Sequence, residues 1–207
     1  MGYYPIGLDL TGRPCLVIGG GAVAQRKVEG LVAAGARVTV VSPSLGPGLL
    51  RLATEARLRW QPREYTAGDA AGFVLVMVAT NDGDVNAAAA AECREQGIWI
   101  NCADDPARCD FILPAVLRRG PVTVAISTGG ASPTMARLLR EELEALLPED
   151  VGAFTEIVAR VRRELREGGI SLDAGRWRQA LDGELRSLVA AGRRVEAQVK
   201  LRKCLGA

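Results

Sequence analysis

A glycine-rich turn near the start of the chain has the residue types and spacing of a dinucleotide site. Residues 19–24 read Gly-Gly-Gly-Ala-Val-Ala, which matches the pattern G-x-G-x-x-A. In such a turn, Gly19 permits a tight bend, Gly21 lets the backbone approach a pyrophosphate, and Ala24 lets the next helix pack closely. The free N–H groups of that helix bind phosphates well. The turn either binds a dinucleotide or is only structural, and its place between a predicted strand and helix favours binding.

A serine-containing segment stands where a dinucleotide-binding sheet usually carries an acidic residue, about twenty residues beyond the glycine motif. The sequence there reads Val41-Ser42-Pro43-Ser44, with no carboxylate and no arginine directly after it. A serine hydroxyl can donate to a ribose hydroxyl, whereas a 2′-phosphate has no evident partner, so we expect NAD rather than NADP. The residues expected to bind the cofactor are Gly19, Gly21, Ala22, Val23, Ser42, Pro43, Ser44, Thr80, Asn81 and Cys102.

Polar residues also follow two further predicted strands, at residues 80–82 (Thr-Asn-Asp) and 101–105 (Asn-Cys-Ala-Asp-Asp). Ligands of open α/β sheets bind at the carboxyl ends of the strands, so both groups should face the same crevice as the glycine turn. The chain has no histidine, which excludes a Ser-His-Asp triad and a histidine base. Asp104 and Asp105 are therefore candidates for acid/base work, or they cap the local backbone. Cys102 is either a nucleophile or a buried side chain that packs in the core.

Arginines and hydroxyl residues form a third group of candidates. The loop at residues 127–133 (Ser-Thr-Gly-Gly-Ala-Ser-Pro) precedes a predicted helix, whose free N–H groups could bind a carboxylate or phosphate. Arginine pairs with carboxylates through two parallel hydrogen bonds. The alternative is a helix cap beside solvated arginines. The residues expected to contact a substrate are Arg119, Thr128, Ser132 and Arg137.

Alternating short strands and helices must position these residues. Such alternation predicts a doubly wound parallel α/β sheet. The predicted strands are 14–19, 36–42, 58–61, 73–80 and 98–102, and the predicted helices are 22–34, 45–56 and 85–96. The pattern then changes to strands at 111–117 and 122–127, followed by helices at 134–147, 153–167 and 173–190 and a basic last stretch to 203. These changes suggest three parts, with bounds 1–110, 111–150 and 151–207.

Composition narrows the functional classes. The 207 residues include five cysteines, an odd number with no Cys-x-x-Cys pair, so a disulfide framework is not expected and a cytoplasmic setting fits. We see no signal peptide and no apolar run long enough to span a membrane. Because most zinc sites use histidine, we expect no metal site.

Charge is distributed unevenly along the chain. Residues 1–150 carry 14 basic and 17 acidic residues, whereas residues 151–207 carry 12 basic and 7 acidic ones. The basic end either attracts an anionic partner or is a solvated helical surface. No helix-turn-helix pattern is evident, so we expect no nucleic-acid partner.

Several segments resemble the precorrin-2 dehydrogenase family of siroheme synthesis, in the expected order over residues 5–148. The most specific stretch runs from Arg119 to Pro133 and continues through residues 136–140. Shorter matches are Pro5-Ile6, residues 15–24, Arg26-Lys27, residues 79–82, residues 101–104 and residues 111–115. The resemblance implies a Rossmann domain, a small α+β dimerisation segment at 111–147, and a helical domain that helps enclose a tetrapyrrole.

The same resemblance implies an activity. It is the NAD-dependent dehydrogenation of precorrin-2 to sirohydrochlorin by a homodimer, with Asp104 as the acid/base group. Some members also insert ferrous iron, which makes a bifunctional dehydrogenase and ferrochelatase the main alternative. A non-enzymatic, NAD-binding redox sensor is a further alternative. Fused members carry a methyltransferase domain, which we expect this chain to lack.

Overall fold

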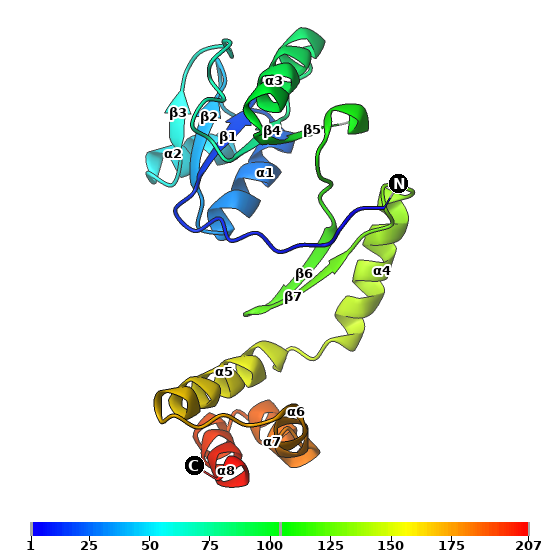
Figure 1. Ribbon diagram of the computed structural model, residues 1–207. Helices are drawn as coiled ribbons and strands as arrows, with labels where there is room; N and C mark the ends of the chain where they lie inside the picture. Colours follow the sequence, from blue (N-terminus) through cyan, green and yellow to red (C-terminus); the bar gives the residue numbers. More distant parts are fainter. Residues whose placement is uncertain (1, 104, 207) are drawn as a thin grey trace. The chain divides into compact units, whose positions relative to one another are not determined.

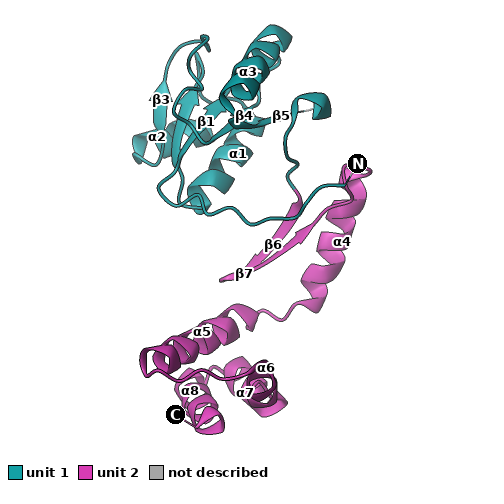
Figure 2. Cartoon of the chain, viewed as in Figure 1, with its two compact units in different colours: residues 1–113 teal, residues 114–207 magenta. Residues whose placement is uncertain are grey.

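The computed structural model describes residues 2–103 and 105–206, so the predicted acid/base residue Asp104 lies outside the described residues. The chain forms two compact units, residues 1–113 and residues 114–207 (Figure 2). The three-part division expected from the sequence stays a prediction.

The first unit contains a parallel sheet of five strands. They are β1 (Pro14–Ile18), β2 (Arg37–Val41), β3 (Arg59–Gln61), β4 (Leu75–Val78) and β5 (Trp99–Cys102), in the order β3-β2-β1-β4-β5. Ile18 pairs with Val41 on one side and Val78 on the other, and Val78 pairs with Cys102. Val41 also pairs with Gln61, so all five strands end at one level, and the strand order changes direction between β1 and β4. This reversal is the point at which open α/β sheets bind ligands.

Helices cover both faces of this sheet (Figure 1). Side chains alternate along β1, so Cys15 and Val17 pack with α1 (Ala22–Ala33) and α2 (Pro47–Thr54). Leu16 and Ile18 point to the opposite face and pack with α3 (Gly83–Gln96). This arrangement confirms the predicted doubly wound, Rossmann-like sheet. A short 3₁₀ turn, η1 (Pro106–Arg108), follows β5.

The second unit begins with a hairpin of β6 (Ala115–Arg119) and β7 (Val122–Ile126), followed by α4 (Pro133–Leu146). The strand predicted at 111–117 is wrong at its start, since β6 begins at Ala115. The carbonyl of Phe111 instead accepts a hydrogen bond of 2.9 Å from the side chain of Asn101. Pro114 has no N–H to donate, so pairing starts only after it.

Four helices complete the second unit: α5 (Val151–Glu167), α6 (Ala174–Ala180), α7 (Gly183–Ala190) and α8 (Arg194–Leu205). Their apolar faces share one core, which includes Val161, Leu185 and Leu201. The single helix predicted at 173–190 is wrong, because it is divided into α6 and α7. Asp182 begins the second of these helices by accepting a hydrogen bond of 2.7 Å from the N–H of Leu185.

Two glycines meet where the hairpin approaches α5. A Cβ on Gly152 would lie 2.7 Å from the carbonyl oxygen of Arg119, and one on Gly120 would lie 3.2 Å from the Cα of Gly152. Gly120 also has a φ of +55°, in the left-handed region that favours glycine. The hairpin turn and the first turn of α5 therefore touch through their backbones. Among the described helices, none is long and apolar enough to cross a membrane.

Candidate functional site

The glycine turn after β1 lies against the ends of both neighbouring strands. The N–H of Gly19 donates to the carbonyl of Val41 at 2.9 Å. Gly19 has a φ of +117°, and a Cβ there would lie 2.3 Å from the carbonyl oxygen of Ala79. Only glycine fits this conformation and this approach. The turn is therefore held where the strand order reverses, as the sequence pattern predicts.

Gly20 is equally constrained, although the G-x-G-x-x-A pattern leaves its position open. A Cβ there would lie 1.9 Å from the carbonyl oxygen of Ser44 and 2.7 Å from the hydroxyl oxygen of Ser42. The carbonyl of Gly20 also accepts a hydrogen bond of 2.9 Å from the N–H of Gly46. Sequence reasoning missed this role, and the run of three successive glycines is the signal that could have revealed it.

The N-terminus of α1 is open to an anion. Gly21 precedes the helix, no side chain caps its first N–H groups, and its first turn holds no acidic residue. Nothing described lies within 4 Å of where a Cβ on Gly21 would be. Gly21, Ala22 and Val23 are exposed, whereas Ala24 is buried against the sheet. Free N–H groups and the positive end of the helix dipole suit a pyrophosphate, so these residues fit a dinucleotide.

The segment after β2 forms hydrogen bonds within itself and with β3. The hydroxyl of Ser42 donates to the carbonyl of Ser44 at 2.8 Å, and the indole N–H of Trp60 donates to the carbonyl of Ser42 at 2.9 Å. Ser42 is buried, whereas Pro43 and Ser44 are exposed. The hydroxyl hydrogen of Ser42 is therefore engaged within the loop, and Ser44 offers the accessible hydroxyl for a ribose.

The residues after β4 lead into the cap of α3. The hydroxyl of Thr80 accepts from the N–H of Asp82 at 2.7 Å, and Asp82 caps the helix. Asn81 is exposed. The side-chain oxygen of Asn86 is buried without a hydrogen-bond partner among the described residues, although its NH₂ donates to the carbonyl of Thr80 at 3.4 Å. Sequence reasoning missed Asn86, whose position in an alanine-rich helix gives no signal.

A lysine from α1 reaches the end of β5. The ammonium of Lys27 donates to the side-chain oxygen of Asn101 at 2.6 Å, and Asn101 is buried. This contact places a positive charge beside the end of β5. The neighbouring carboxylate of Asp105 forms an ion pair with Arg108. The sequence singles out Lys27 only as part of a resemblance, because its partner lies far along the chain.

Cys102 packs in the core below this edge. Its side chain belongs to the buried cluster under α3, and burial raises the pKa of its thiol to about 11. A thiol with so high a pKa carries little thiolate near neutral pH, so packing is favoured over nucleophilic catalysis. The backbone of Cys102 is occupied too, since its N–H donates to the sulfur of Cys109 at 3.2 Å.

The four candidate substrate residues of the second unit are not brought together within one chain. Arg119 pairs with Val122 at the turn of the hairpin, whereas Ala115 and Ile126 mark its other end, next to the loop at 127–133. The guanidinium of Arg119 lies 3.5 Å from Glu144 near the end of α4. Arg137 is exposed on the second turn of α4.

Hydroxyl groups close the loop before α4. Thr128 accepts from the N–H of Ser132 and donates to its carbonyl, both at 3.0 Å. Ser132 in turn caps α4 by accepting from the N–H of Met135 at 3.1 Å. The structure thus favours the helix-cap interpretation for these two side chains. Among residues 2–103 and 105–206, no group of three acidic or cysteine side chains is arranged to hold a metal ion.

Comparison with known proteins agrees with this geometry. A family model described as NAD(P)-binding matches residues 6–115, and one described as the central part of a sirohaem biosynthesis protein matches residues 119–146. The chain belongs to this family of NAD(P)-binding siroheme biosynthesis proteins. The resemblance seen in the sequence and the expected nicotinamide dinucleotide domain are both confirmed.

Individual relatives support the assignment. The chain is 42% identical over 200 residues to a siroheme synthase of Methylococcus capsulatus and 39% identical over 207 residues to siroheme synthase 1 of Serratia proteamaculans. It spans only 42% and 44% of the lengths of these relatives. A solved structure of SirC, a precorrin-2 dehydrogenase, is similar over 97% of this chain and 100% of its own, with a TM-score of 0.78 and 26% identity.

Proposed function

We propose that the chain catalyses the NAD-dependent dehydrogenation of precorrin-2 to sirohydrochlorin, a step of siroheme or cobalamin synthesis. The observation that carries this proposal is the similarity to SirC, which extends over the whole of that precorrin-2 dehydrogenase. The open helix N-terminus after the glycine turn supports it, because it fits the pyrophosphate of a dinucleotide.

The residues of the first unit have distinct roles in this proposal. The N–H groups at the start of α1 bind the pyrophosphate, and Ser44 and Asn81 offer exposed polar groups at the adjacent strand ends. When bound, NAD supplies the acceptor for the hydride that leaves precorrin-2. Asp104 accepts the proton that leaves with it, directly or through water. The Lys27–Asn101 contact fixes the side chain of a residue near the end of β5.

The test is an anaerobic assay with purified protein, NAD and precorrin-2, in which NADH and the sirohydrochlorin spectrum should appear together. Asp104→Asn should lower the rate by about a hundredfold, the size of general acid/base effects, while the Kd for NAD stays unchanged. The matched control is Asp105→Asn, which removes the neighbouring, ion-paired carboxylate and should leave the rate within about twofold. An unchanged rate in Asp104→Asn would remove its proposed role.

A bifunctional enzyme that also inserts ferrous iron into sirohydrochlorin is the second candidate. The names of the relatives favour it, since siroheme is the iron complex of sirohydrochlorin. Ferrous iron would then be a co-substrate. Incubation of sirohydrochlorin with Fe²⁺, with and without the protein, separates the candidates, and equal rates would exclude the chelatase.

We also propose that two copies associate through α4. The apolar side chains exposed on this helix are Met135, Leu138, Leu139, Leu143 and Leu146, with exposed fractions of 37–76%. Such a continuous apolar face is typical of an interface. Sedimentation should show a dimer that Leu138→Glu weakens. Arg119, Thr128, Ser132 and Arg137 stay proposed contacts for substrate carboxylates.

The cysteines bear on the cellular compartment of the protein. All five cysteines are free thiols, which suits a reducing compartment. We therefore propose a cytoplasmic location.

A further inference from the structure

A cavity lies in the helical part of the second unit, lined by α5, α6 and the segment between them. Its volume is about 640 Å³, and Trp177, Leu172 and Ile170 are among its lining residues. Sites for small molecules have volumes of about 300–1,000 Å³ and mostly apolar walls. The cavity therefore has the size and the apolar surface of a ligand site.

Arginines supply the charge of this cavity. Arg162 and Arg166 stand one turn apart on α5, and Arg178 lies on α6. No carboxylate is among the residues that line it. Within residues 2–103 and 105–206, none of these three arginines takes part in an ion pair, whereas nearby Arg202 pairs with Glu164 at 2.8 Å. The protein therefore leaves the positive charge at this cavity without neutralisation.

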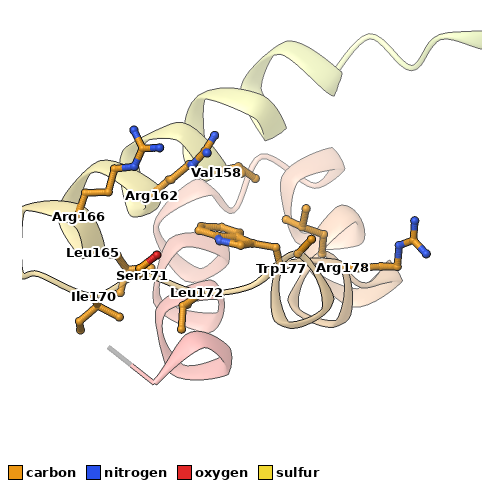
Figure 3. A pocket seen from close by; sticks show the side chains of 11 residues that line it. Val158, Arg162, Leu165, Arg166, Ile170, Ser171, Leu172, Trp177 and Arg178 are labelled. Carbon is orange, nitrogen blue, oxygen red and sulfur yellow. The ribbon is translucent and has the colours of Figure 1, made fainter.

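The indole of Trp177 provides a flat apolar surface between the charged groups. Figure 3 shows its ring in the middle of the cavity, with Arg162 and Arg166 above it on α5, at the rim, and Arg178 on α6 pointing away from the ring. All three arginines are exposed. Ser171 adds a hydroxyl from the connecting segment. A guanidinium pairs with carboxylates, and an aromatic face stacks against a conjugated ring. The combination selects a ring system that carries carboxylates at its edge.

We propose that this cavity is a second, non-catalytic site for a polycarboxylated tetrapyrrole, with carboxylates on Arg162 and Arg166 and the ring against Trp177. The identification of the ring as a tetrapyrrole rests on the proposed function. The charge and the apolar surface stand independently of it. The site contains no carboxylate to move a proton, so it holds the ring without changing it.

The probe for the test is uroporphyrin, a stable tetrapyrrole with carboxylates around its edge, added to the full chain. Binding should quench the fluorescence of Trp177. The variant Arg162→Glu/Arg166→Glu should weaken binding about tenfold or more at low salt, because two charge-assisted contacts become repulsive. The matched control is Arg160→Glu/Arg163→Glu, which makes the same charge change on exposed positions of α5 that do not line the cavity.

The outcomes separate the cavity from general surface charge. Equal weakening by both double variants, or no weakening by either, would overturn the proposal. Competition by inositol hexakisphosphate, which has charge but no flat conjugated ring, should be weak, and displacement at similar concentrations would overturn the role of Trp177. Trp177→Phe should retain most of the binding while it removes most of the quenching.

The dehydrogenase assay makes the two proposals distinguishable. If NADH forms but uroporphyrin binds the Arg162→Glu/Arg166→Glu variant as tightly as it binds the unchanged chain, only the proposal of the second site is wrong. If uroporphyrin binding depends on these arginines but precorrin-2 yields no NADH, the proposed function is wrong and the cavity still binds a polycarboxylated ring.

Discussion

Two helix N-termini of this molecule have similar sequences before them but different structures. Both α1 and α4 follow a strand and a loop rich in glycine, and the sequence suggests an anion site at each. At α1 no side chain caps the helix, and Gly21 is exposed. At α4, Ser132 caps the helix and Thr128 bonds to the backbone of Ser132. A loop whose own hydroxyls satisfy the helix therefore leaves fewer N–H groups for a ligand.

The largest expected effect comes from Gly19→Ala. The new Cβ would lie 2.3 Å from the carbonyl of Ala79 at a φ of +117°, which should lower the free energy of unfolding by about 3 kcal/mol. Thermal unfolding measures this loss. Gly21→Ala is the control, since nothing lies near its Cβ, and equal melting temperatures for the two variants would contradict the described turn.

A smaller effect is expected from Gly21→Val, which acts on binding rather than folding. Its side chain would occupy the open space before α1, so the Kd for NAD should rise by about tenfold, or about 1.4 kcal/mol, with the melting temperature unchanged. Isothermal titration gives the Kd. The matched change before α4 is Ala131→Val, also at an exposed position. If this variant weakened NAD binding equally, the distinction between the two helix N-termini would fail.

The smallest effect is expected from Ser132→Ala, which removes the cap of α4. Loss of a serine cap costs about 1 kcal/mol. The free energy of unfolding should therefore fall by that amount, while the Kd for NAD stays the same. Chemical denaturation with urea provides the measurement. A Ser132→Asp variant, which can accept the same hydrogen bond from Met135, should restore stability. No loss in Ser132→Ala would show that this cap is unimportant.

Local patterns predicted most of the first unit. Alternating apolar strands and helices suffice to predict the sheet, because each element buries one face and the connections are short. The glycine motif also located the turn beside β1. What could not be predicted are contacts between distant residues, such as Lys27 with Asn101, or Arg119 with Glu144. Neither pair has a spacing that identifies it.

Two predicted elements of the second unit have wrong bounds because local side-chain and backbone effects override the apolar pattern. Helical periodicity continues through residues 173–190, but the carboxylate of Asp182 bonds to the N–H of Leu185 and starts a new helix. The Asp182-Gly183 pair was a visible signal for this break. At the start of β6, the apolar run from Phe111 suggested a strand, whereas Pro114 delays pairing until Ala115.

The backbone contact between Gly120 and Gly152 has a consequence for finding and redesigning related chains. A methyl group on Gly152 would reach the carbonyl of Arg119. A larger residue at one glycine cannot be offset at the other, because glycine is already the smallest residue. A homologue that keeps this joint should therefore carry glycine at both corresponding positions. The pair can serve as a sequence filter, and a graft that moves the hairpin onto another helical bundle needs both glycines to be transferred together.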